Sequence, residues 1–180
     1  APTNFNFVSG DYNRETGLKG DAGAKYLDSN RNSSADPQDD NHLSLYITQA
    51  NTADGRYYAG VGDITGSATN LSYYSPGGGL NTRNRSATAT YSLSGTQPTG
   101  FFGMSRASSS EYTRRAVGVT STATVSSSTP FSLNYYIYKT NNNNGMNGRL
   151  SFYSIGEALD LALLDARVTT LMSDIGAAIP

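Results

Sequence analysis

The sequence predicts an all-β protein, an antiparallel sandwich that ends in one amphipathic helix. Most of the chain consists of short segments in which apolar and polar residues alternate, and this period of two is typical of strands that bury one face. Gly, Pro, Ser and Asn separate these segments at close spacing, which favours many short strands joined by tight turns. Only the last part of the chain repeats its apolar residues every three or four positions, as a helix does.

Length and composition limit the classes of protein to consider. The 180 residues fit a single domain, in which hydrophobic residues make up 37% and charged residues 15%. The net charge of -1 gives no broad attraction to a phosphate backbone, and no apolar run is long enough to cross a membrane. Cysteine is absent, which excludes disulfides and thiolate metal sites. We therefore expect neither nucleic acid nor a membrane as a partner.

The alternation of apolar and polar residues places the strands. In the clearest one, Leu43, Leu45 and Ile47 share one face, and the residues between them point to the other face. Further strands are expected at Tyr57–Val61, Ala87–Leu93, Gly100–Arg106, Tyr112–Thr120 and Phe131–Tyr138. Ser121–Thr129 keeps some alternation, and we interpret it as an exposed strand and turn. Many short strands at this spacing predict a sandwich.

The terminal helix is expected over Leu159–Ile179, with Gly176 and Pro180 marking its end. Its apolar stripe consists of Leu161, Leu164, Val168, Leu171 and Ile175. We expect this stripe to pack on the sandwich of the same chain. The same residues also fit a heptad pattern, which leaves self-association through the helix as a second hypothesis.

Two signals compete for the start of this helix. Ser154 and Glu157 have the spacing of a capping box, whereas Asp160 can cap a helix that begins at Leu161. The chain as a whole is expected to divide into an N-terminal arm, a sandwich and the helix, all within one domain. The expected bounds are 1–23 for the arm, 24–158 for the sandwich and 159–180 for the helix. The arm contains Phe5 and Phe7, and we expect it to dock on a partner.

One segment resembles a known family. Gly148–Gly156, followed by a Leu-Asp step and the helix, is similar to the closing motif of laminin-G-like and concanavalin A-like jelly rolls. Earlier segments agree with this resemblance at the level of motifs, from Tyr26 to Leu171: Leu27–Asn30, His42–Ile47, Tyr57–Val61 and Gly100–Arg106. More narrowly, Gly148–Leu159 with the Leu-rich tail resembles laminin-G-like domains in structural proteins of tailed bacteriophages and prophages.

The resemblance implies an antiparallel jelly-roll sandwich with a non-enzymatic role on the exterior of a virion. Such domains decorate capsids or form part of tails and tail fibres, so the expected partners are other virion proteins and further copies of the same chain. Because one jelly roll hosts many functions, a carbohydrate-binding module that recognises a host surface glycan is the alternative.

Tyrosine and asparagine are the candidate residues for contact with a glycan or a protein partner. A sugar ring needs an aromatic platform with fixed polar groups beside it, and tyrosine and arginine are favoured anchors of protein interfaces. The candidates are Tyr57, Tyr58, Tyr73, Tyr74, Asn141, Asn142, Arg114 and Arg115. Strand tyrosines, Asn-rich hairpin tips and arginines at strand edges also occur without any ligand, so a purely structural role stays open for each.

Catalysis has little support in the sequence. A glycosidase needs two carboxylates across a cleft, but Glu15, Glu111 and Glu157 lie in unrelated segments. The single histidine, His42, follows Asp39-Asp40-Asn41 and is expected in a polar turn that enters a strand. We therefore expect no enzyme.

Calcium is the one cofactor for which the sequence offers candidate ligands. Asp28, Asp36, Asp39 and Asp40 offer oxygen ligands of the type that calcium prefers. Their spacing matches no EF-hand loop, and clusters of Asp with Asn and Pro usually form turns. No other cofactor is expected.

Overall fold

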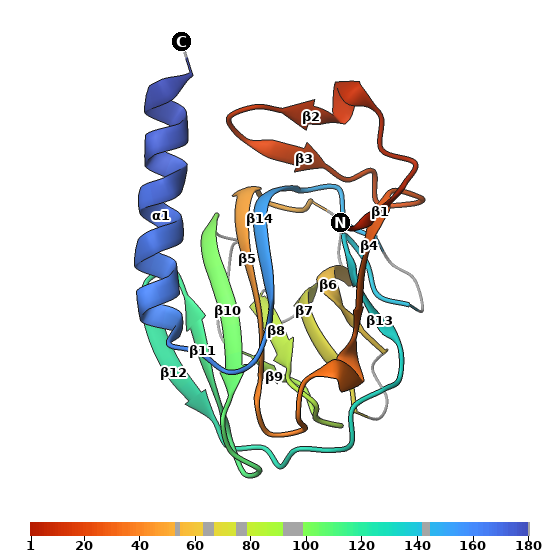
Figure 1. Ribbon diagram of the computed structural model, residues 1–180, viewed down its shortest axis with the longest axis vertical. Coiled ribbons are helices and arrows are strands. Elements are labelled where there is room, and N and C mark those ends of the chain that lie inside the picture. The colour runs from red at the N-terminus through yellow and green to blue at the C-terminus, as the bar shows by residue number, and fades with distance from the viewer. Residues whose placement is uncertain (53–54, 63–66, 75–78, 92–98, 142–144, 180) are drawn as a thin grey trace.

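The computed structural model describes residues 1–52, 55–62, 67–74, 79–91, 99–141 and 145–179. Two antiparallel sheets pack face to face, and one helix lies along the second sheet (Figure 1). The first sheet contains, in spatial order, β1 (Thr3–Phe5), β4 (Tyr26–Asn32), β13 (Asn134–Ile137), β6 (Arg56–Val61), β7 (Thr69–Tyr74), β8 (Gly79–Arg83) and β9 (Thr90–Tyr91). The second contains β12 (Val119–Ala123), β11 (Tyr112–Ala116), β10 (Gly100–Arg106), β5 (Asn41–Gln49), β14 (Arg149–Gly156), β3 (Gly17–Lys19) and β2 (Tyr12–Asn13). This architecture confirms the predicted all-β sandwich with a C-terminal helix.

The core forms as the alternation in β5 predicts. Leu43, Leu45 and Ile47 are buried between the sheets, whereas Tyr46 faces the opposite side of the second sheet and packs under the helix. The neighbouring strand β10 repeats this arrangement, because Phe102 packs in the main core and Phe101 lies against the helix. The second sheet therefore buries both of its faces at this point.

The expected strand Tyr112–Thr120 is wrong as a single element. The structure has a hairpin there, in which β11 and β12 pair from Tyr112 opposite Ala123 to Ala116 opposite Val119. Val117 and Gly118 have φ of 49° and 75°, and two consecutive residues with positive φ make the tight turn that suits a hairpin. The turn was not predicted from the sequence because Val117 is β-branched, and such a residue rarely adopts positive φ. The Ser121–Thr129 segment begins in β12 and continues after Ala123 without regular structure.

The other expected strands differ mainly at their ends. β5, β6, β10 and β13 are present at the predicted places, and β14 covers most of Gly148–Gly156, the segment that carries the resemblance. Of Ala87–Leu93, only Thr90–Tyr91 is a strand, and residues 92–93 lie outside the described part of the chain. β7 and β8 were not predicted, because their polar residues obscure the alternation.

The helix α1 (Leu161–Ala178) starts at the second of the two predicted signals. The Asp160 carboxylate accepts hydrogen bonds from the backbone N–H groups of Ala162 (2.8 Å) and Leu163 (3.0 Å), which satisfies two donors of the first turn. The capping box of Ser154 with Glu157 does not form, since Ser154 lies within β14.

The apolar stripe of α1 packs on the second sheet, as expected. Leu161 and Val168 are buried against Phe101, with Leu164 and Met172 partly buried beside them. Further along the helix Leu171 is 47% exposed, so the stripe is covered mainly in the first half of α1. Arg115 of β11 fixes the helix through an ion pair with Asp165, with 2.7 Å between Nε and Oδ2.

Residues 1–23, the expected arm, contribute to both sheets. β1 extends the first sheet by pairing with β4, and the hairpin β2–β3 extends the second sheet by pairing with β14. Between them Phe7 is only 8% exposed and joins the main core. Docking of this segment on a partner stays a prediction.

Candidate interaction site

The predicted tyrosines lie together in the first sheet, on β6 and β7. Tyr58 is 2% exposed, its hydroxyl accepts from the backbone N–H of Asn51 at 3.4 Å, and burial raises its pKa to about 12. No ligand can reach its ring, because Tyr58 is the member of the pair that faces the core. Tyr57 is half-buried, and Tyr73 packs partly against the core. The side chain of Tyr74 lies outside the described part of the structure.

Of the other predicted residues that the structure describes, Asn141 lies beside the end of β6, and the two arginines lie in the second sheet, away from the tyrosines. The Asn141 side chain makes two hydrogen bonds to the main chain: it accepts from the Gly62 N–H at 3.0 Å and donates to the Asn134 carbonyl at 3.1 Å. Asn142 lies outside the described residues. Arg114 and Arg115 stand on β11 in the second sheet, half-buried, and Arg115 is held by the helix.

The four aspartates considered for calcium have separate roles. Asp36 is buried and pairs with Arg31, while Asp40 accepts from the Ala158 N–H at 2.6 Å. Asp28 accepts from the Asn30 N–H at 2.8 Å, and Asp39 lies in the turn before β5. Within the described ranges, no three acidic or histidine side chains come close enough to hold a metal ion.

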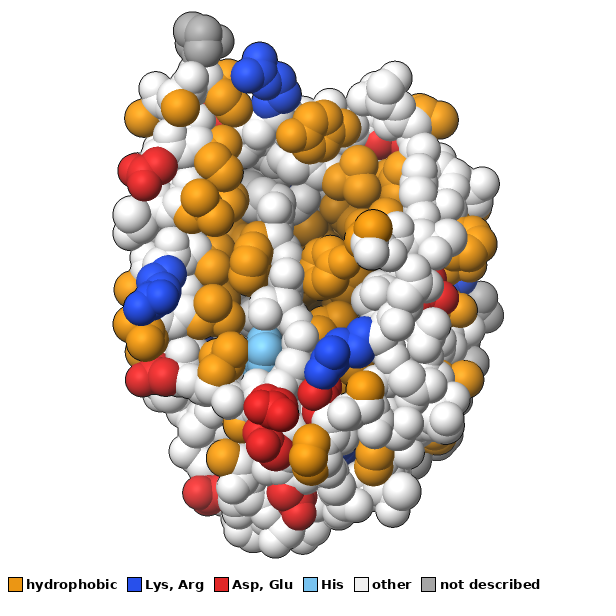
Figure 2. All heavy atoms as spheres, viewed as in Figure 1, with side chains coloured by type: hydrophobic (Ala, Val, Ile, Leu, Met, Phe, Trp, Pro, Cys, Tyr) orange, Lys and Arg blue, Asp and Glu red, His pale blue; other side chains and the backbone are white. Residues whose placement is uncertain are grey.

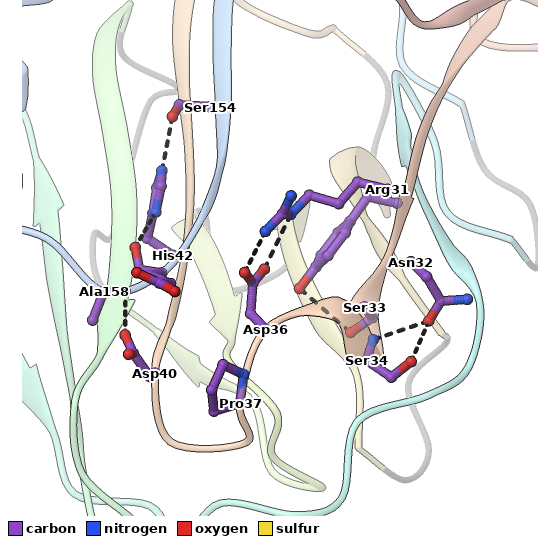
Figure 3. A network of polar contacts seen from close by, with 12 residues as sticks. Arg31, Asn32, Ser33, Ser34, Asp36, Pro37, Asp40, His42, Ser154 and Ala158 are labelled. Atoms are coloured by element: carbon purple, nitrogen blue, oxygen red, sulfur yellow. Dashed lines mark hydrogen bonds and ion pairs between the residues drawn. The ribbon is translucent and has the colours of Figure 1, made fainter.

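A network of polar contacts ties the loops at one end of the sandwich together (Figure 3). Arg31 on β4 meets Asp36 through both Nε and Nη2, with 3.1 Å between Nε and Oδ2. The segment that leads into α1 is held at three points: Glu157 by His42, Ala158 by Asp40 and Leu159 by the Ser105 hydroxyl. These contacts fix the connection from β14 to the helix.

His42 is the centre of this connection. It is 4% exposed, and its Nδ1 lies 2.6 Å from the Glu157 carbonyl oxygen, so Nδ1–H donates to that carbonyl. In the neutral ring Nε2 then accepts from the Ser154 hydroxyl at 2.8 Å. Burial lowers the pKa of His42, which favours this neutral form. The expected polar turn does lead into a strand here: Asp39 and Asp40 lie in the turn, β5 begins at Asn41, and His42 is buried as the second residue of β5.

An apolar groove lies between the two sheets, where β14 and β3 of the second sheet face β4 and β13 of the first. Figure 2 shows apolar side chains gathered in a hollow on this face of the molecule. The groove has a volume of about 230 Å³, and its walls include Leu18 and Leu150 from the second sheet and Leu27 and Ile137 from the first. Tyr153 of β14 also lines it, and burial raises the pKa of this tyrosine.

The groove runs beside an incomplete strand pairing. β14 pairs with β5 along its length but with β3 only at Arg149 and Leu150. From Ser151 to Gly156 the outer edge of β14 has no strand partner among the described residues. The side chains of this stretch are all half-buried. The groove therefore combines apolar walls with a row of main-chain groups that can pair with another strand.

Sequence reasoning missed this edge, although one signal was present. Ser151–Gly156 contains no charged residue and no proline, which are the residues that usually protect an exposed strand edge. The pairing of β3 with only the first residues of β14 could not be read from local pattern.

A second, larger hollow of about 620 Å³ lies at the start of α1. Leu159, Asp160 and Leu161 line it from the helix side, and Ser105 and Tyr112 line it from the second sheet. Neither hollow is lined by His42 or Ser154.

The comparisons add no relative to this picture. No protein-family model matches the chain, and no curated protein matches it. Among the described residues, no helix has both the length and the apolar character that a membrane span requires.

Proposed function

We propose that the chain is a non-enzymatic structural component on the exterior of a tailed-phage particle, in capsid decoration or a tail fibre, and that it acts through contacts with other proteins. The virion part of this proposal rests on the resemblance of Gly148–Leu159 and the Leu-rich tail to such proteins. The contact part rests on the apolar groove beside the unpaired edge of β14.

The groove supports protein contact because of its chemistry. Apolar surface next to unpaired main-chain groups is best covered by another polypeptide, which supplies both apolar side chains and hydrogen bonds. Two further apolar residues of the N-terminal segment are exposed, Val8 (64%) and Tyr12 (59%), and Tyr12 also lines the groove. A role in assembly uses all of these features.

The carbohydrate-binding alternative has less support. Tyr58 lies in the core and Tyr73 packs against it, so the predicted aromatic platform is reduced to Tyr57 among the side chains described on β6 and β7. A glycan array separates the two proposals, since selective binding would favour the module and silence would favour the structural role.

The location on a particle can be tested directly. Particles induced from the genome that encodes the chain are purified on a density gradient, and the chain is quantified by mass spectrometry and located by immunogold labelling. We expect stoichiometric amounts with label on intact particles. A chain that is absent from the particles, or labelled only after they are opened, contradicts the proposal.

A further inference from the structure

We propose that two copies of this chain pair through the open edge of β14, so that their second sheets join into one continuous sheet. This inference deepens the proposed structural role, on which it rests, by naming a second copy as the partner of the groove.

The main chain of β14 determines what kind of group can cover it. Ser151–Gly156 is extended and pairs with β5 on one side, so alternate N–H and C=O groups are directed to the other side, where no strand pairs with them among the described residues. The first half of this stretch, Ser151–Tyr153, lines the groove. An extended strand satisfies such a row of groups, whereas a small ligand or a helix does not.

The side chains indicate that this strand is β14 of another copy. In an antiparallel pair about a twofold axis through Ser154, Tyr153 lies opposite Ile155 of the partner subunit on the core face. Both residues are partly buried against the main core, so the pairing extends that core across the axis. On the outer face Phe152 lies opposite Gly156 of the partner subunit, which places a large side chain against the residue with none.

Charge also permits self-pairing at this edge. The stretch carries no ionisable group other than Tyr153, so two copies meet without like-charge repulsion. The other edge of the same sheet, β12, differs because Thr and Ser follow its one exposed apolar residue, Val119. Only Thr120 of this strand lines a hollow, the one at the start of α1. β12 is therefore a control within the same sheet.

Light scattering on the purified full chain tests the pairing. We expect a mass of twice the 19.1 kDa of one chain at high concentration and a fall toward one chain on dilution. Ile155→Lys places a charge at the centre of the joined sheets and should give one chain at all concentrations, whereas Val119→Lys on β12 should leave the dimer intact. A wild-type chain that stays monomeric, or an Ile155→Lys variant that is folded and still dimeric, overturns the inference.

The position of the twofold axis is tested by cross-linking. Because the chain has no cysteine, Ser154→Cys should form a disulfide-linked dimer under mild oxidation, and Val119→Cys should not. If Ser154→Cys does not fold, hydrogen exchange on the wild type decides: amides of Ser151–Gly156 should be protected at high concentration and lose that protection on dilution. Exchange that does not depend on concentration overturns the pairing. None of these results depends on the chain belonging to a particle, so the proposed location is tested separately.

Discussion

Arg106 shows how the interior of this sandwich holds a charge without a carboxylate. Its side chain is fully buried, and its guanidinium lies 5.2 Å from the centre of the Tyr112 ring. The donors reach main-chain carbonyls of loops at one end of the sandwich: those of Asn84, Ser108, Glu111 and Val125. One side chain therefore satisfies acceptors from several separate segments.

Replacing Arg106 by methionine should destabilise the fold strongly. The methionine fills part of the volume, but the buried carbonyls lose their donors, and we expect a loss of roughly 3 kcal/mol in the free energy of unfolding. Urea denaturation measures this difference. The matched control is Arg14→Met, because Arg14 is exposed; its loss should stay within about 0.5 kcal/mol. Equal effects of the two substitutions would show that the carbonyl contacts of Arg106 contribute little.

His42 predicts how the stability depends on pH. Burial holds the pKa of its imidazole below the ordinary value of 6.5, against a smaller opposing effect of the Glu157 carbonyl. Asp36 raises this pKa and Arg31 lowers it, and these two form a pair with each other. The unfolded chain therefore binds more protons than the folded chain just below pH 6.5. The stabilising contribution is complete above that value and is lost as the pH falls toward the folded pKa.

We expect the urea midpoint of the wild type to fall more steeply between pH 7.5 and pH 5.5 than that of His42→Gln. His42 is the chain's one histidine, so the difference between the two proteins isolates its titration from that of the carboxylates. Parallel pH profiles for the two proteins would mean that folding leaves the pKa of His42 unchanged.

At the scale of the element, the start of α1 depends on one carboxylate. Asp160→Ala removes the acceptor for the N–H groups of Ala162 and Leu163, so we expect a loss of about 1 kcal/mol, seen as a lower thermal midpoint by about 3 °C. Asp174→Ala is the matched control, since Asp174 lies near the C-terminal end of the helix, where a negative charge is unfavourable. Its midpoint should stay the same or rise slightly. A lower midpoint for Asp174→Ala only would contradict the assigned cap.

Local pattern predicted the elements whose burial follows a simple period. The alternation in β5 and the stripe of α1 were sufficient, because one face of each is buried along its length. The hairpin β11–β12 was missed because its turn uses Val117, a residue that sequence rules do not associate with positive φ. β7 and β8 were missed because polar residues such as Asn70 and Thr82 are buried there by tertiary packing.

The candidate site was less predictable than the fold. Tyr58 and its neighbour Tyr57 were both considered for binding, and the pattern could not decide which one faces the core; the structure buries Tyr58. The groove depends on where β3 leaves β14, a contact between residues far apart in the sequence. Such a contact follows from the topology of the sheet, which the local alternation of apolar and polar residues does not predict.

At the scale of the whole molecule, the N-terminal segment closes one end of the sandwich. It crosses from the edge of the first sheet at β1 to the edge of the second at β2, and η1 (Ser9–Asp11) lies between them. Asp11 pairs with Lys25 at 2.6 Å, and the Asp11 carbonyl accepts from Arg149 of β14 at 3.0 Å. Deleting Ala1–Asp11 is therefore expected to destabilise the sandwich, so loss of a partner after this deletion would not by itself identify a docking segment.

Phe7 is the residue through which this closure can be tested. Its ring lies between the two sheets with its centre 4.9 Å from that of Tyr138, in an edge-on arrangement. Phe7→Ala leaves a cavity at the end of the core and should lower the free energy of unfolding by about 3 kcal/mol. Phe5 stacks on Tyr26 at 4.3 Å but is 37% exposed, so Phe5→Ala should cost about 1 kcal/mol. Urea denaturation of both variants gives the comparison. A larger loss from Phe5→Ala would mean that the N-terminal segment is held mainly by contacts on the outer face of the first sheet. An arm held in that way could detach to bind a partner and leave the core unchanged.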